Sequence, residues 1–139
     1  MGSVLLLALV LAACGGTPAD TTVGDPPQSK VIEASGNQQI DKLVADWKIA
    51  VPASMKEQLV KDPIEEKVYQ SNASLEEIDA FYKKLTENSW IESTRMPGIQ
   101  NGILLTGYDS GNTALIVGAV DAKPLGGTGV IVYTAKGTK

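Results

Sequence analysis

The chain has 139 residues, of which 43% are hydrophobic and 20% are charged, and its formal net charge is −4. The net negative charge and the lack of any Lys/Arg run argue against a nucleic-acid-binding surface, so we expect no nucleic-acid partner. With no histidine and one cysteine, the chain cannot build an internal disulfide or the usual zinc and hydrolase sites. We expect no metal, no cofactor and no catalytic residues.

The first feature along the chain is a short apolar run, VLLLALVLAA over residues 4–13, which ends at Cys14. Such a run is too short to span a bilayer as a helix, but it is typical of a secretory signal closed by small residues. Leu11, Ala12 and Ala13 before Cys14 resemble the lipobox of bacterial lipoproteins. The resemblance implies cleavage between Ala13 and Cys14, acylation of Cys14, and an extracytoplasmic protein anchored to the cell membrane or outer membrane. The alternative is an apolar segment in the core, with Cys14 as a small hydrophobe.

Residues 14–36 are predicted to be the lipidated cysteine and a flexible linker, after a signal peptide at residues 1–13. The stretch GGTPADTTVGDPPQSK is rich in Gly, Pro, Thr and Asp, and its one large apolar residue is Val23. Such a segment buries too little surface to offset the entropy lost on ordering. The alternative is an ordered, extended segment that lies on the domain.

A single domain is predicted over residues 37–139, and it opens with two helices. The residues that recur at the spacing of one helical face are Ile40, Leu43, Val44 and Trp47. Pro52 is predicted to interrupt this helix. The stretch ASMKEQLV (53–60) then predicts a second short helix, which Pro63 stops.

A strand and a helix are predicted next, from EEKVYQ (65–70) and SLEEIDAFYKKLTE (74–87). Ser74 and Glu77 have the spacing of a capping box, which satisfies free N–H groups at a helix start. The apolar face of this helix consists of Ile78, Phe81, Tyr82 and Leu85. Trp90 is expected to fold back into the core.

Three strands are predicted in the last third of the chain, from GILLTGY (102–108), NTALIVGAV (112–120) and VIVYTAK (130–136). DSGN joins the first two as a hairpin turn, and the second is apolar on both faces, as expected of a central strand. The predicted fold is α+β: N-terminal helices, then β-α-β-β-β, with a small antiparallel sheet and the helices packed on one face.

The stretch KVYQSNASLEEIDAFYKKLTENSW resembles a module of small, uncharacterised bacterial lipoproteins. The shared pattern is a strand ending in Tyr, a Ser-x-x-Glu helix cap, Phe-Tyr and a final Trp. The matching positions are Val68, Tyr69, Ser74, Glu77, Ile78, Phe81, Tyr82, Leu85 and Trp90, whereas the Gly that precedes the Trp in the family is Ser89 here. The resemblance implies a fold and a location, and it offers no catalytic residues.

Several motifs favour structural roles over chemical ones. LGGTG (125–129) could cradle a phosphate, but no helix and no Lys-Ser/Thr follow it, which favours a hairpin loop. Asn72-Ala73-Ser74 has the form of a glycosylation site, although Ser74 is expected to cap a helix. Glu65 and Glu66 could form a carboxylate pair, but adjacent strand residues point to opposite faces. The aromatic residues could line a groove for glycan or peptide, and their spacing favours the core.

The segment STRMPGIQN (93–101) is the best candidate for a contact surface, because exposed loops carry binding more often than covered elements. Within it, Arg95, Met96 and Pro97 are the predicted contact residues. We therefore expect a non-catalytic, membrane-anchored envelope lipoprotein whose domain binds an extracytoplasmic protein or glycan. The alternative is a small extracytoplasmic hydrolase or transferase with carboxylate or Ser/Lys chemistry.

Overall fold

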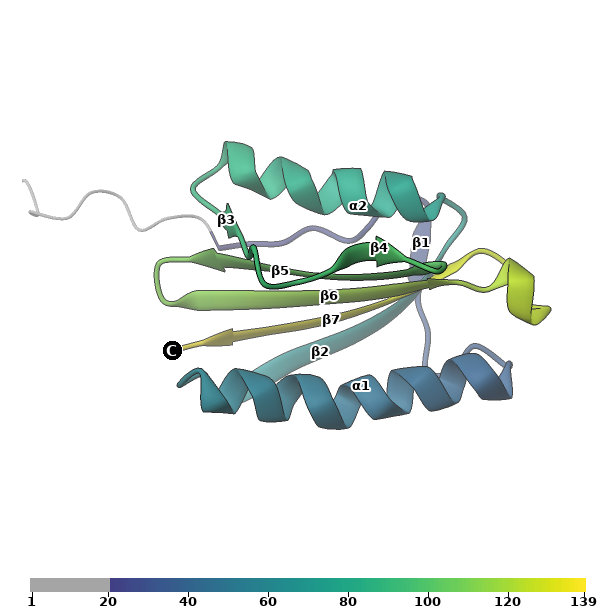
Figure 1. Cartoon of the computed structure of the whole chain (residues 1–139), viewed down its shortest axis with the longest axis horizontal. Coiled ribbons are helices and arrows are strands. Elements are labelled where there is room, and N and C mark those ends of the chain that lie inside the picture. The colour runs from purple at the N-terminus through teal and green to yellow at the C-terminus, as the bar shows by residue number, and fades with distance from the viewer. Residues whose placement is uncertain (1–20) are drawn as a thin grey trace, which may run out of the picture.

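The computed structural model describes residues 21–139, and in this part of the chain it has two α-helices and a seven-stranded antiparallel sheet (Figure 1). The elements are β1 (Ser29–Val31), α1 (Gln38–Glu57), β2 (Lys61–Ser71), α2 (Leu75–Lys83), the 3₁₀ helix η1 (Lys84–Glu87), β3 (Ile91–Glu92), β4 (Gly98–Gln100), β5 (Ile103–Ser110), β6 (Thr113–Asp121), the 3₁₀ helix η2 (Lys123–Leu125) and β7 (Val130–Thr138). The sheet order is β1-β2-β7-β6-β5-β3, and β4 also pairs with β5. The α+β class is confirmed.

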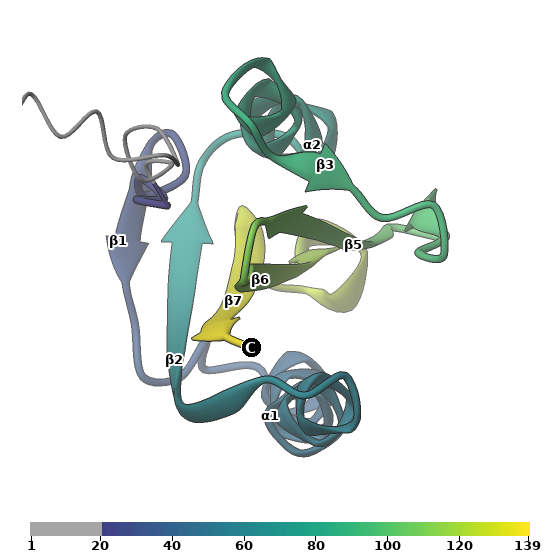
Figure 2. The ribbon, with the colours of Figure 1, turned by 90° about the vertical axis from the view of Figure 1, so that its left-hand side faces the viewer.

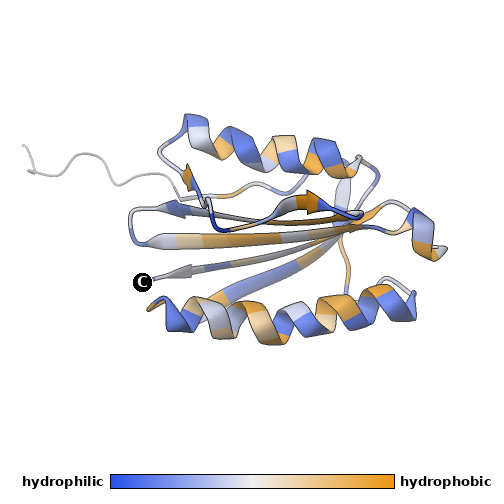
Figure 3. Cartoon of the chain, in the orientation of Figure 1, coloured by the Kyte–Doolittle hydropathy of each residue, from blue (hydrophilic) through white to orange (hydrophobic). Residues whose placement is uncertain are grey.

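The two helices cover opposite faces of the sheet, so the prediction that they pack on one face was wrong (Figure 2). Neighbouring residues of β7 show this, because Tyr133 packs in the α1 cluster and Val132 in the α2 cluster. The central strand β6 is apolar on both sides and is coloured accordingly along much of its length (Figure 3). A strand of this kind needs a covering layer on each face.

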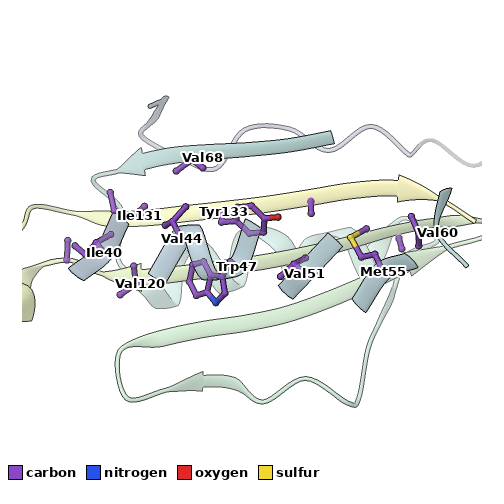
Figure 4. Packing of buried hydrophobic residues seen from close by; sticks show 13 residues of the cluster. Ile40, Val44, Trp47, Val51, Met55, Val60, Val68, Val120, Ile131 and Tyr133 are labelled. Atoms are coloured by element: carbon purple, nitrogen blue, oxygen red, sulfur yellow. The ribbon is translucent and has the colours of Figure 1, made fainter. Parts of the chain in front are cut away.

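Helix α1 is continuous from Gln38 to Glu57, so the prediction of two helices separated at Pro52 was wrong. Pro52 removes one main-chain hydrogen bond and typically costs about 3 kcal/mol in a helix interior. The apolar stripe continues past it, however, and its buried members are Ile40, Val44, Trp47, Val51 and Met55 (Figure 4). Burial of Val51 and Met55 against the sheet offsets that cost, at roughly 1.5–3 kcal/mol for each large apolar side chain.

Packing beneath α1 depends on Gly118 of β6. A Cβ atom at this position would lie 3.0 Å from the Trp47 ring. The missing side chain therefore makes the space in which the indole lies flat on the strand. Trp47 also contacts Tyr133 of β7, with 6.1 Å between the ring centroids.

Helix α2 begins as the sequence predicts. The Ser74 hydroxyl accepts a hydrogen bond from the Glu77 N–H, and the Glu77 carboxylate accepts one from the Ser74 N–H, which completes the capping box. The helix is followed by η1, and Trp90 is buried in the cluster beneath α2, also as predicted. The hairpin of β5 and β6 is confirmed too, whereas the short strands β1, β3 and β4 were not predicted.

The prediction of a flexible linker is wrong for residues 21–36, because this segment lies on the domain. We call residues 21–31 the N-terminal strap. Val23 packs against the α2 cluster, Asp25 accepts a hydrogen bond from the Tyr69 hydroxyl at 2.8 Å, and β1 pairs with β2. The Ser71 hydroxyl adds a hydrogen bond to the Pro27 carbonyl at 2.6 Å. The folded unit therefore begins before residue 37, the predicted start of the domain.

Candidate functional site

The predicted contact segment, residues 93–101, lies along the β5 edge of the sheet after β3, and its second half forms β4. Arg95 and Pro97 are exposed and Met96 is half-buried. Arg95 and Met96 line a hollow of about 250 Å³, which we call the edge hollow; its other lining residues are Met55, Gln58, Ser93, Gly107, Tyr108, Asp109, Ala114, Leu115, Ile116 and Lys139. Pro97 is not among them. The structure thus brings two of the three predicted contact residues together.

The edge hollow has an apolar floor and a charged rim. Gly107 of β5 permits the floor, because a Cβ atom there would lie 3.2 Å from Ile116 Cδ1 and 3.6 Å from Met96 Cε. On the rim, the Lys139 ammonium pairs with the Asp109 carboxylate at 3.2 Å, and Arg95 is exposed. Met55 and Gln58 reach the hollow from the end of α1, more than thirty residues away in sequence, so local patterns could not reveal them.

A second, smaller pocket lies between the N-terminal strap and the α2 face of the sheet. Its volume is about 30 Å³, and its lining residues are Val23, Gly24, Glu65, Lys67, Tyr69, Tyr82, Leu115, Thr134 and Lys136. A space of this size holds one or two water molecules, not a substrate. The Lys67 ammonium pairs with Glu65 at 3.3 Å, and that of Lys136 donates to the Thr21 carbonyl at 3.3 Å.

The tyrosines around this pocket are held neutral. Burial is the main cause that raises the pKa of Tyr82 and Tyr69, and the hydrogen bond to Asp25 adds to the effect at Tyr69. At the edge hollow, burial also raises the pKa of Tyr108 to about 12. Within residues 21–139, the buried Tyr82 hydroxyl has no hydrogen-bond partner. These phenols are therefore poor bases and nucleophiles near neutral pH, and they cannot replace the missing histidine.

A third hollow lies at the end of the sheet where β2 ends and β7 begins. It has a volume of about 390 Å³ and is lined by residues of the α2 start and the neighbouring turns: Asn72, Ala73, Ser74, Leu75, Glu76, Glu77, Ile99, Gly102, Asp121, Lys123, Gly129 and Val130. Ser74 and Glu77 are engaged with each other in the capping box. The nearby LGGTG motif connects β6 to β7, so the hairpin-loop prediction is confirmed.

The carboxylate pair does not form a catalytic site. Glu66 accepts a hydrogen bond from the Tyr133 hydroxyl, whose ring packs with α1, whereas Glu65 lines the pocket on the α2 face. In the described residues, no group of His, Cys, Asp and Glu side chains could hold a metal ion. The aromatic residues belong to the core, as predicted: both tryptophans and all four tyrosines are buried, and Phe81 is half-buried.

Comparisons with protein families, with curated protein sequences and with solved structures find no match to this chain. The proposed cleavage and acylation site, Ala13 and Cys14, lies outside the described residues. Across residues 21–139, neither helix has the length and hydropathy required to span a membrane.

Proposed function

We propose that this protein is a lipid-anchored, non-catalytic envelope protein that binds an extracytoplasmic partner through the edge hollow. Its signal peptide is cleaved after Ala13, and acylation of Cys14 holds it on the cell membrane or outer membrane. Two or more acyl chains give a stable anchor, since each buried methylene contributes about 0.8 kcal/mol. The observation that carries the binding role is the edge hollow itself, with Arg95 and Met96 beside an apolar floor.

The chemistry of the edge hollow fits a protein partner better than a glycan. Arg and Met are enriched at protein interfaces, and the flexible thioether of Met96 can adapt to an apolar side chain of the partner. The exposed Arg95 guanidinium offers a fork of donors for a carboxylate or main-chain carbonyl. Glycan sites commonly use exposed aromatic platforms, whereas the tryptophans and tyrosines of this chain are buried.

The carboxylate and serine side chains that the alternative enzyme role would require are not arranged for catalysis. Glu65 and Glu66 face opposite sides of the sheet. The Ser71 and Ser74 hydroxyls are engaged in structural hydrogen bonds, to a strap carbonyl and within the α2 cap respectively. We therefore place binding ahead of hydrolase or transferase chemistry.

The anchor is tested by mass spectrometry of the protein isolated from its own cell envelope. The mature chain is expected to begin at Cys14 and to carry added acyl mass on that residue. A Cys14→Ser variant should keep residues 1–13 and carry no acyl mass. Recovery of a full-length, unacylated wild-type chain would refute the anchor.

The binding surface is tested by site-specific photocrosslinking in intact envelopes. A benzoylphenylalanine at position 96 should give a discrete crosslinked product, and Arg95→Glu in the same chain should reduce its yield several-fold by reversing the rim charge. The matched control places the probe at position 49, because Ile49 is 74% exposed on α1 and does not line the edge hollow. Equal products from positions 96 and 49 would contradict the proposal.

A further inference from the structure

The strap brings the chain into the domain at one particular end of the sheet. The Thr21 carbonyl accepts a hydrogen bond from Lys136 near the end of β7, at 3.3 Å. We call this the proximal end: here α1 ends, β2 begins and the β5–β6 turn lies (left in Figure 1). The distal end carries η2 and the start of β7.

The proximal end has to stay close to an anchor at Cys14. The chain from Cys14 to Thr21 reaches at most about 25 Å, whatever conformation its residues take. The nine-residue strand β7 alone is about 30 Å long. An acylated Cys14 thus keeps the proximal end near the lipid surface, whereas the distal end is free to stand away from it.

Two of the most exposed large apolar side chains lie at this proximal end. Leu59, after the end of α1, is 77% exposed, and Ile91 of β3 is 73% exposed. Ile91 pairs with Asp109 near the β5–β6 turn, and Leu59 comes just before β2. The strand that follows Leu59, β2, and the strand of Ile91, β3, are four strand spacings apart in the sheet, or roughly 19 Å. Together with the anchor at Cys14, Leu59 and Ile91 give three points at which the domain can touch the surface of the bilayer.

Leu59 also has a backbone conformation that is unusual for a leucine. Its N–H bonds to the Lys56 carbonyl and that of Val60 to the Met55 carbonyl, both at 3.0 Å, which is the Schellman pattern that ends many helices. Leu59 occupies the left-handed position of this motif, with φ of 70°, where glycine is usual and a β-carbon is strained. The structure keeps a leucine at a strained position and does not bury its side chain. Packing within the domain therefore does not account for it.

Charges at the proximal end are mixed. Lys56 pairs with Asp62 at 3.4 Å, and Lys139 pairs with Asp109 at 3.2 Å. The exposed Lys61 and Arg95 are balanced in sign by Glu57 and Glu92, so the end has little excess positive charge with which to select anionic headgroups. An apolar contact with the bilayer interface fits this composition better than an electrostatic one.

We propose that the domain stands with its proximal end on the bilayer, inserting Leu59 and Ile91 into the lipid interface. This inference rests on the proposed anchorage at Cys14. The lipid contact would hold the distal end outward and would place the edge hollow, whose rim shares Asp109 and Lys139 with the proximal end, directly beside the bilayer. The partner of this surface is the phospholipid interface itself, with no requirement for anionic lipid.

The experiment uses the chain from Cys14 onward, coupled through the Cys14 thiol to a maleimide lipid in phosphatidylcholine vesicles. This coupling tests the contact whether or not cells acylate Cys14, so the two proposals can fail separately. A benzoylphenylalanine is placed in turn at positions 59, 91, 49 and 125, and crosslinking to radiolabelled phosphatidylcholine is counted. Positions 49 and 125 are the controls, because Ile49 faces solvent on α1 and Leu125 lies at the distal end.

Probes at positions 59 and 91 are expected to label lipid at least about fivefold more than those at 49 and 125, and the ratio should not change when phosphatidylglycerol is added. Leu59→Gly should reduce labelling from position 91 several-fold, on the order of the loss of one apolar side chain. This variant also relieves the strained φ, so its thermal stability should match or exceed that of the parent chain. Equal labelling at all four positions, or contact only with anionic lipid, would overturn the proposal.

Discussion

The two faces of the sheet are covered in different ways. Beneath α1, one long helix presents a continuous apolar stripe, and Trp47 lies over Gly118. Beneath α2, a short helix and the N-terminal strap share the cover, and three tyrosines, Tyr69, Tyr82 and Tyr108, lie among the aliphatic residues. The α1 face is therefore stabilised by packing of large apolar groups. The α1 face contains one phenol, Tyr133, whose hydroxyl reaches Glu66, whereas the α2 face has to accommodate three, and that of Tyr82 has no hydrogen-bond partner in the described residues.

The largest expected difference between the two faces is the loss of folding stability at alkaline pH. Burial raises the pKa of Tyr69, Tyr82, Tyr108 and Tyr133 above the ordinary value of 10. The resulting stabilisation is fully present below pH 10 and is lost as the pH rises through the folded pKa values, the lowest of these being about 12, at Tyr108. At about 1.4 kcal/mol per group and pH unit, the four tyrosines together would lower the free energy of unfolding by on the order of 5 kcal/mol at pH 11.

The measurement is urea unfolding between pH 8 and 11, with tyrosinate absorbance as a second signal. Because three of the four tyrosines lie on the α2 face, Tyr133→Phe should preserve about three quarters of the pH dependence. A free energy of unfolding that stays constant up to pH 11 would contradict the account of the α2 face.

Truncation of the central residue of the α1 face should be the next largest effect. Trp47→Ala removes a side chain that is 8% exposed, and we expect a loss of about 3–5 kcal/mol in the free energy of unfolding. Ile49→Ala, on the solvent side of the same helix, is the matched control and should change stability by less than about 0.5 kcal/mol. Urea unfolding at pH 7 compares the two, and similar losses would show that α1 packs differently.

The smallest effect concerns single hydroxyl groups on the α2 face. Tyr82→Phe removes a buried hydroxyl that has no partner in the described residues, so stability should stay constant or rise by up to about 1 kcal/mol. Tyr69→Phe removes the hydrogen bond to Asp25 and should destabilise by about 0.5–1.5 kcal/mol. Thermal unfolding of both variants at pH 7 is the measurement. A clear loss from Tyr82→Phe would indicate that a bound water satisfies that hydroxyl.

The sequence predicts those elements whose signals are local. The capping box of Ser74 and Glu77, the apolar face of α2 and the turn between β5 and β6 all depend on residues a few positions apart, and all are confirmed. The continuity of α1 was missed, because the cost of Pro52 is local whereas the burial that offsets it comes from strands far along the chain.

The strap and the full candidate site depend on long-range contacts. Residues 21–31 read as a flexible linker because their own composition is polar, and the partners that order them, in β2, β7 and the α2 cluster, lie far along the chain. Arg95 and Met96 could be predicted from an exposed loop, whereas Met55 and Ile116, which complete the edge hollow, come from other elements. Leu59 carries no sequence signal of its strained backbone, which becomes visible only in the φ angle.

The strap also determines how the domain would respond to mechanical tension. A pull on the chain ahead of Thr21 reaches the Lys136 contact first, then Val23, then the bond between Asp25 and Tyr69, and only afterwards the ladder of β1 with β2. Because the strap runs along the sheet from the proximal to the distal end, a pull from the proximal side acts along the strap and loads these contacts in shear. The wide central strands β2, β7, β6 and β5 would carry load only after the strap has detached. Under tension, the strap would therefore detach from the sheet before the core of the domain unfolds.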